Sequence, residues 1–172
     1  MDEIELIIPD KKHKKQIERF KRDFLSTDSV MHGAGGLDKN DADTWLKECD
    51  DYRIGRNLPK DHVCSTQFIV IRKNDGKIVG VIQIRHSLTP LLRRIGGHIG
   101  YSVVSGERRK GYASEMLRIA LAECRRLDIS EVFVSCDADN IASCKVIKNN
   151  GGVFDSESEY EGKLLHMYRI LN

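Results

Sequence analysis

Several short stretches of the chain are rich in β-branched and other apolar residues and are bounded by turn residues, which predicts β-strands. The segments 66–73 and 77–86 have this pattern on either side of Asn74-Asp75-Gly76. Because Asp-Gly readily supplies the positive φ that a tight turn needs, this pattern is typical of a β-hairpin. A further strand is predicted at 98–104, where the residues HIGYSVV lead into a charged loop.

Other stretches place hydrophobic residues every three or four positions, which is typical of amphipathic helices. The clearest stripe runs from about Tyr112 to Leu127, and Arg125 and Arg126 suit the negative end of its dipole. Shorter helices are predicted at about 10–25, 42–49 and 141–149. The remaining predicted strands are 3–8, 131–136, 153–158 and 163–171, the last two turned near Glu161-Gly162.

The order of these elements is β-α-α-β-β-β-α-β-α-β-β, which indicates an α/β (α+β) fold with a mixed sheet. A chain of 172 residues with 40% hydrophobic content is long enough for one core and short for two. We therefore expect a single domain over residues 1–172. The glycine-containing stretch 26–63 is expected to be largely irregular apart from its one short helix.

The charge balance gives no general reason to expect a nucleic-acid or membrane-surface partner. Lys and Arg total 28 against 26 Asp and Glu, a formal net charge of +2. The N-terminal charges flank a short apolar run in the reverse order of a signal peptide, and no apolar stretch approaches membrane-spanning length. The five scattered cysteines lack a C-x-x-C spacing, which favours reduced thiols over a zinc site. We expect a cytoplasmic protein without a metal.

Chemistry is most clearly indicated at residues 105–117, where a strand runs through a short loop into an amphipathic helix. The first N–H groups of a helix lack intrahelical partners, so a phosphate can bind them. Gly111 would let the backbone approach the phosphate, and Ala113 keeps the first turn narrow. Local positive charge comes from Arg108, Arg109 and Lys110. Taken alone, the segment is equally consistent with a solvated charge run before an ordinary helix.

Two motifs together resemble a known family. Arg108-x-x-Gly111-x-Ala113 resembles the coenzyme A pyrophosphate signature of the GNAT superfamily of N-acetyltransferases. The segment 140–146, NIASCKV, is similar to the N-x-x-S-x-x-V motif of the ribosomal-protein alanine acetyltransferase-like branch, where it lies beside the pantetheine arm. Asn140 and Ser143 are also ordinary helix-capping residues when taken alone. The resemblance is strong over 66–158 and weak over 1–65.

The resemblance implies a GNAT-like fold with a mixed, mostly antiparallel central sheet of about seven strands flanked by about four helices. It also implies acetyl-CoA as co-substrate and direct attack on the thioester by a primary amine in a ternary complex. In this family a backbone N–H before the phosphate loop meets the thioester oxygen. The implied cofactor-binding residues are Val103, Val104, Arg108, Arg109, Lys110, Gly111, Tyr112, Ala113, Ser114, Asn140 and Ser143.

The catalytic groups are less clearly marked. His98 begins the strand before the phosphate loop and is our candidate for the general base, because an imidazole near pKa ~6.5 can accept a proton at neutral pH. A hydrogen-bonded residue at a strand start is the alternative, with Glu107 or a water chain then acting as base. Ile147 stands where many relatives carry the tyrosine that protonates the thiolate. Tyr101 or Tyr112 could replace it in principle, although tyrosines at such positions more often pack.

The sequence thus predicts an N-acetyltransferase, with a catalytically silent coenzyme A sensor and a binding module on the same scaffold as alternatives. The acceptor should be a small-molecule amine or a peptide or protein amine, with no nucleic acid and no membrane, and a homodimer is left open. Its pocket should be shaped by residues 26–63 and 88–97, where loops are expected.

Overall fold

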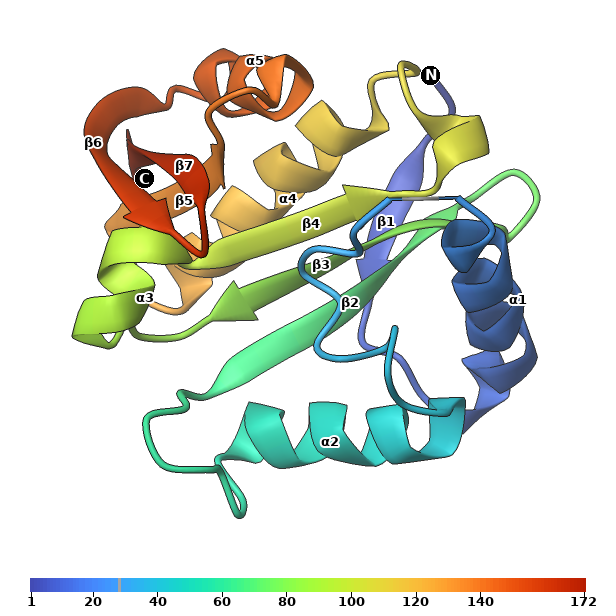
Figure 1. The fold of residues 1–172 in the computed structure, drawn as a ribbon. Helices are drawn as coiled ribbons and strands as arrows, with labels where there is room; N and C mark the ends of the chain where they lie inside the picture. Colours follow the sequence, from blue (N-terminus) through green and yellow to red (C-terminus); the bar gives the residue numbers. More distant parts are fainter. Residues whose placement is uncertain (28) are drawn as a thin grey trace.

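The computed structural model describes residues 1–27 and 29–172, which fold into a layered α/β domain (Figure 1). The strands in this part of the chain are β1 (Ile4–Ile7), β2 (Ser65–Arg72), β3 (Ile78–Arg85), β4 (Ile99–Val103), β5 (Glu131–Asp137), β6 (Val153–Tyr160) and β7 (Lys163–Leu171). Its α-helices are α1 (Lys14–Leu25), α2 (Ala42–Ile54), α3 (Pro90–Ile95), α4 (Tyr112–Arg126) and α5 (Ile141–Asn149). Single 3₁₀ turns, Lys11–His13 and Ser105–Glu107, precede α1 and follow β4.

The strands form two antiparallel sheets, one in the order β1-β2-β3-β4 and the other in the order β5-β7-β6. The mixed α/β class is confirmed, and the expected strands are divided between a four-stranded and a three-stranded sheet in place of one central sheet. Within the described residues, an isolated bridge between Gly97 and Val134 joins the two sheets. Beyond this bridge, β4 and β5 belong to different sheets and do not pair with each other. We call the unpaired interval between these two strands the gap.

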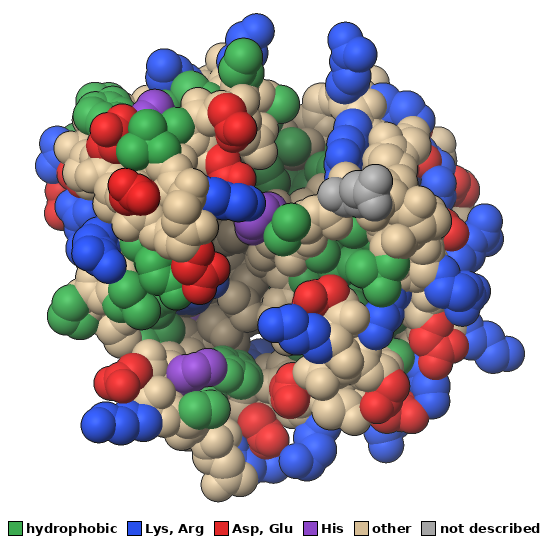
Figure 2. All heavy atoms as spheres, in the orientation of Figure 1, with side chains coloured by type: hydrophobic (Ala, Val, Ile, Leu, Met, Phe, Trp, Pro, Cys, Tyr) green, Lys and Arg blue, Asp and Glu red, His purple; other side chains and the backbone are tan. Residues whose placement is uncertain are grey.

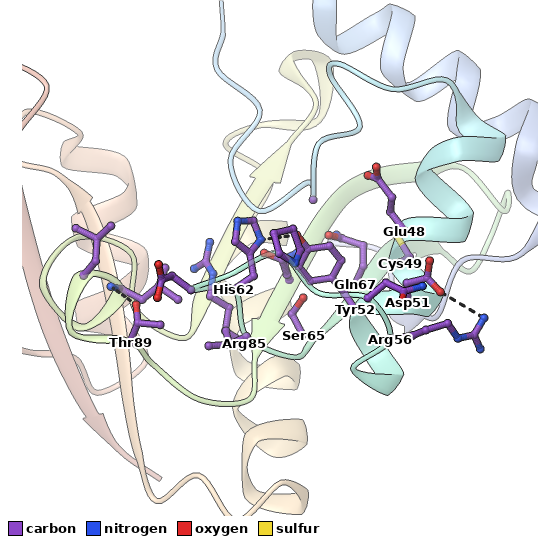
Figure 3. Close-up of a pocket in the computed structure, with 18 of the residues that line it drawn as sticks. Glu48, Cys49, Asp51, Tyr52, Arg56, His62, Ser65, Gln67, Arg85 and Thr89 are labelled. Carbon is purple, nitrogen blue, oxygen red and sulfur yellow. Dashed lines mark hydrogen bonds and ion pairs between the residues drawn. The ribbon is translucent and has the colours of Figure 1, made fainter.

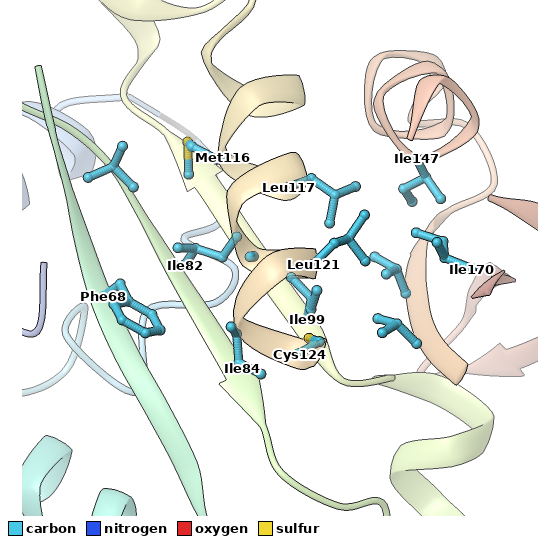
Figure 4. Close-up of a cluster of buried hydrophobic side chains, with 14 of the residues drawn as sticks. Phe68, Ile82, Ile84, Ile99, Met116, Leu117, Leu121, Cys124, Ile147 and Ile170 are labelled. Atoms are coloured by element: carbon cyan, nitrogen blue, oxygen red, sulfur yellow. The ribbon is translucent and has the colours of Figure 1, made fainter. Parts of the chain in front are cut away.

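Helices cover both faces of the four-stranded sheet (Figure 1). On one face, α4 buries Met116, Leu117 and Leu121 against side chains of β2, β3 and β4 (Figure 4). This cluster continues past α4 to Ile147 of α5 and Ile170 of β7. On the opposite face, α1 and α2 bury a second cluster that includes Phe20, Phe24, Trp45, Ile69 and Val81. β2 and β3 are consequently buried on both sides, which is why their sequences are almost continuously apolar.

Two helical features differ from the sequence prediction. The helix expected at 42–49 extends to Ile54, where Gly55 closes it in the left-handed conformation with a φ of 73°. The segment 88–97, expected to be a loop, contains α3. Thr89 caps α3 by accepting from the N–H of Leu92, and Pro90 occupies its first turn, where a missing N–H costs nothing.

No helix in the described part of the chain is long and apolar enough to cross a membrane.

Candidate active site

The gap between β4 and β5 is bordered by backbone groups that β3 does not use. The N–H of Val104 donates to the carbonyl oxygen of Val79 at 3.0 Å, so it points toward β3. N–H directions alternate along an antiparallel ladder, so the N–H of Val103 points the other way, toward the gap. Of the two valines predicted to meet the thioester, only Val103 presents its N–H to this gap. The N–H of Val104 is already bonded to Val79, so it is not free to donate to a ligand.

Arg108 fixes the loop that follows β4. Its Nε donates to the carbonyl oxygen of Val103 at 2.9 Å, and its guanidinium carbon lies 5.6 Å from the centre of the Phe24 ring. This contact turns the side chain back onto the strand. Arg108 therefore holds the loop in place. The sequence predicted a contact with phosphate for this residue and did not predict this structural role.

Glu107 is a buried carboxylate at the centre of a cluster of cations. It accepts hydrogen bonds from Arg72 at 2.9 Å, Lys77 at 2.7 Å and Lys110 at 2.8 Å. Burial by itself would raise the pKa of Glu107, but the hydrogen bonds from Lys110 and Lys77 outweigh it and hold that pKa at about 2. So weak a base cannot take a proton from an amine at neutral pH, which excludes the alternative that Glu107 is the base. Much of the charge of Lys110 is offset by the same contact.

The start of α4 is capped by a glycine at the end of an exposed loop. Gly111 is its N-cap, with a φ of 89°, and Arg109 also takes a left-handed φ of 64° in the exposed loop. Such backbone is uncommon for a residue with a side chain and is concentrated at functional sites. Tyr112 is buried beneath this loop, and its phenol donates to Asp2 at 3.3 Å. Only the backbone of Tyr112 can therefore face a ligand.

The first turn of α4 also contacts α5. Asn150 donates from its Nδ2 to the hydroxyl and to the carbonyl oxygen of Ser114, both at 3.2 Å. Ala113, the other small residue of the predicted motif, is half-buried against the apolar core. Asn150, the C-cap of α5, thus ties the C-terminal end of α5 to the first turn of α4.

The N-terminus of α5 faces β4 through a pair of hydroxyl groups. Asn140 caps α5 by accepting from the N–H of Ser143 at 3.0 Å, which leaves its exposed amide group outside the helix. The hydroxyl of Ser143 lies 2.8 Å from the phenol of Tyr101. Burial raises the pKa of Tyr101 to about 12, so the phenol keeps its proton at neutral pH. Ile147, where many relatives have a tyrosine, is fully buried in the core instead.

His98 is held by the backbone of β5 where the gap closes. The ring nitrogen Nδ1 of His98 accepts from the backbone N–H of Phe133 at 3.0 Å. The backbone N–H of His98 donates to the carbonyl oxygen of Phe133 at 2.6 Å. Burial, with Arg85 and Arg93 nearby, lowers the pKa of the imidazole to about 4. The neutral ring then carries its proton on Nε2 and has no nitrogen left to accept another. This arrangement argues against His98 as the general base.

A cleft of about 810 Å³ opens on the opposite face of the four-stranded sheet. It lies between α2, α3 and the ends of β2 and β3, and the molecular surface is visibly hollowed there (Figure 2). Side chains from these elements converge on it (Figure 3). Both segments that were expected to shape an acceptor pocket, 26–63 and 88–97, contribute to its walls. Its floor is made of polar strand residues that sequence reasoning missed, namely Ser65, Gln67, Gln83 and Arg85.

Several solved structures share this fold at low sequence identity. The ribosomal-protein-S5-alanine acetyltransferase of Vibrio fischeri has a TM-score of 0.73 at 14% identity, covering 100% of this chain and 94% of that chain. The ribosomal L7/L12 α-N-protein acetyltransferase RimL, in complex with coenzyme A, has a TM-score of 0.69 at 18% identity, covering 98% and 93%. The microcin C7 self-immunity acetyltransferase MccE, bound to acetyl-CoA and AMP, has a TM-score of 0.68 at 16% identity, covering 100% and 94%.

A search of curated proteins returns no significant match. A sequence-family model described as an acetyltransferase (GNAT) domain, however, matches residues 11–153. The match spans most of the chain and includes the loop that ends at Gly111, the Asn140 motif and the residues that line the cleft. The chain therefore belongs to the GNAT family of acetyltransferases and is an acyltransferase.

Proposed function

We propose that this acetyltransferase moves the acetyl group of acetyl-CoA to a primary amine by direct attack in a ternary complex. The observation that carries the proposal is the interrupted sheet. Among the described residues β4 and β5 pair only at the bridge between Gly97 and Val134, so the N–H of Val103 is left free of the sheet between the start of α4 and the face that holds the cleft. Donor and acceptor would then approach this edge of β4 from opposite faces of the sheet.

The residues on the α4 face fit a coenzyme A donor. A pyrophosphate would lie on the backbone N–H groups that begin α4, with Gly111 allowing close approach and Arg109 adding charge. The amide of Asn140 would bond the pantetheine arm, and the N–H of Val103 would stabilise the oxygen of the thioester as it becomes negative. Acetyl-CoA supplies an acyl group that is already activated, so the task of the protein is alignment.

The proton for the leaving thiolate can come from the hydrogen-bonded pair of Tyr101 and Ser143. The two hydroxyls lie 2.8 Å apart at the N-terminus of α5, and the phenol remains protonated at neutral pH. Many relatives supply a phenol from the α5 position that Ile147 occupies here. In this protein Tyr101 would supply the phenol from β4 instead. We therefore assign this pair the role of leaving-group acid.

The test is release of free thiol from acetyl-CoA in the presence of a panel of primary amines, with coenzyme A binding measured in parallel by calorimetry. The proposal expects both coenzyme A binding and amine-dependent thiol release. The absence of an α5 tyrosine at Ile147 also favours a second candidate, a silent coenzyme A sensor. Binding without thiol release for every amine would support that sensor and refute the enzyme, and absence of binding would refute both.

A further inference from the structure

The floor of the cleft is a patch of four polar side chains on an otherwise apolar sheet face. Ser65 pairs with Arg85, and Gln67 pairs with Gln83, across β2 and β3. Cross-strand partners, and residues two apart on one strand, share a face of the sheet, so all four side chains lie together. The next pair along the same face, Ile69 with Val81, belongs to the apolar core. The face thus changes from apolar to polar where the cleft begins.

Gln67 carries a buried acceptor that the described residues do not satisfy. Its side-chain nitrogen donates to the carbonyl oxygens of Gly33 at 2.9 Å and Ile82 at 3.1 Å, which fixes the orientation of the amide. Its Oε1 has no hydrogen-bond partner among residues 1–27 and 29–172, although the residue is only 3% exposed. An unsatisfied buried acceptor destabilises the folded protein, so its retention suggests that a ligand supplies the missing donor.

Arg85 is a cation without an anionic partner in the same patch. Its Nη1 donates to the carbonyl oxygen of Gly97 at 2.9 Å, and no carboxylate of the described residues lies within 4.0 Å of its guanidinium. Burial lowers the pKa of Arg85 from its ordinary value, yet a guanidinium stays charged at neutral pH. The neighbouring Arg56 and Arg93 each pair with an aspartate, at 3.4 Å and 3.1 Å. Arg85 therefore keeps donors for a ligand.

We propose that the cleft selects acceptor amines that carry a carboxylate, which Arg85 binds, while Gln67 Oε1 accepts an N–H of the same molecule. Free amino acids and short peptides with a free carboxyl end are the substrate class. The inference rests on the proposed function, because it describes the acceptor site of that reaction. The substrate carboxylate is assigned to Arg85, and a substrate N–H is assigned to Gln67 Oε1.

The charge of the cleft favours a carboxylate over a phosphate. Its lining contains the acidic side chains Glu48, Asp51 and Asp61 against the two arginines Arg56 and Arg85. A phosphate dianion would add two negative charges to this acidic excess, whereas a zwitterionic amino acid has no net charge and adds none. Glu48, on the α2 wall, already accepts a hydrogen bond from the amide of Asn40 at 2.8 Å.

The experiment compares amino acids and dipeptides with their C-terminal amides, each assayed for thiol release from acetyl-CoA. The acid of each matched pair should have a kcat/KM about ten- to a hundred-fold above that of its amide, as expected for a charge-assisted contact. Arg85→Gln should bring this acid-to-amide ratio close to one, and Arg85→Lys should restore part of it. Arg94→Gln is the matched control, since Arg94 is exposed on α3 outside the cleft, and it should keep the wild-type ratio.

Equal turnover of acids and amides by the wild-type protein would overturn the inference while leaving the acetyltransferase intact. A fall of the same size for acids and amides in Arg85→Gln would overturn it as well. If no amine is turned over, the proposed function fails, and thermal stabilisation then decides the inference alone. Millimolar amino acids should raise the Tm of the wild-type protein and not that of Arg85→Gln, whereas no shift in either refutes carboxylate binding.

Discussion

The two faces of the four-stranded sheet meet their ligands in different ways. On the α4 face, the polar side chains near the motifs already have partners, as in the contacts of Glu107 with Lys110 and of Tyr101 with Ser143. A ligand there would be bound mainly by backbone N–H groups. On the α2 face, Gln67 and Arg85 keep unused hydrogen-bonding capacity in the cleft. The donor site is therefore set by chain geometry, and the acceptor site by the choice of side chains.

The largest expected effect comes from changing the backbone geometry on the α4 face. Gly111→Val forces a β-branched residue toward a φ of 89°, with its Cβ 3.1 Å from the sulfur of Met1, and so distorts the backbone that would hold the phosphate. Coenzyme A binding should weaken about a hundred-fold or more, measured by calorimetry on protein whose folding is checked by circular dichroism. Gly106→Val is the control, because a Cβ there meets nothing within 4 Å. Wild-type affinity in folded Gly111→Val would place the pyrophosphate elsewhere.

A second prediction tests whether the buried charges on this face serve stability. Glu107→Gln leaves three cations without their carboxylate and should lower the free energy of unfolding by about 2–4 kcal/mol at neutral pH. The exposed Glu131→Gln should cost less than about 1 kcal/mol. Denaturant unfolding at pH 7 measures both. Equal losses in the two variants would show that the cluster is no stronger than a surface ion pair.

The pH dependence of the same contribution has a defined direction. The pKa of Glu107 is depressed to about 2 in the folded protein, so its stabilisation is complete above the ordinary carboxyl pKa of 4.5. It is then lost as the pH falls from there toward 2. Unfolding measured across this window should show a steeper acid loss in the wild-type protein than in Glu107→Gln. Parallel curves would contradict the low pKa.

A third prediction concerns the hydroxyl pair at the gap. Tyr101→Phe removes the phenol while keeping the ring, so kcat should fall about ten-fold or more and the affinity for coenzyme A should hold. The matched control is Tyr168→Phe, which removes a buried phenol bonded to Cys144. A fully active Tyr101→Phe would mean that the thiolate departs without help from this phenol. An equal loss in both variants would point to packing instead of proton donation.

The smallest expected effect separates capping from binding on α5. Asn140→Asp keeps the side-chain oxygen that caps the helix but replaces the amide donor with a carboxylate. The KM for acetyl-CoA should rise several-fold, about 1 kcal/mol of binding, while Tm changes little. Asp139→Asn at the neighbouring exposed position should leave both values unchanged. If KM stays constant in Asn140→Asp, the residue is only a cap.

The sequence predicted those features that depend on local contacts. The hairpin at Asp75-Gly76, the start of α4 at Tyr112 and the limits of α5 follow from turn chemistry and helical periodicity. The division into two sheets could not be predicted in this way, because it depends on whether β4 and β5, separated by α4, pair beyond Gly97. α3 was missed because its six residues show too little periodicity, although Thr89 and Pro90 carry a start signal.

In the candidate site, too, residues in local motifs were predicted, and residues whose role depends on distant segments were not. Gly111 and Asn140 were found because each belongs to a compact motif at a helix start. The role of His98 could not be judged, because its hydrogen bond comes from Phe133 on another sheet. Gln67 and Arg85 were passed over because alternating polar positions on a strand ordinarily mean a solvated face. Here α2 and α3 cover that face and turn it into a cleft.

The position of the first residues has a practical consequence for anyone who prepares the protein. A Cβ on Gly111 would lie 3.1 Å from the sulfur of Met1, so an N-terminal affinity tag would begin beside the proposed coenzyme site. Asn172 instead donates to the carbonyl oxygen of Leu121, near the other end of α4. A fifteen-residue helix is about 22 Å long. A C-terminal tag therefore leaves the coenzyme site clear for calorimetry and crystal soaking, whereas an uncleaved N-terminal tag would weaken the measured affinity.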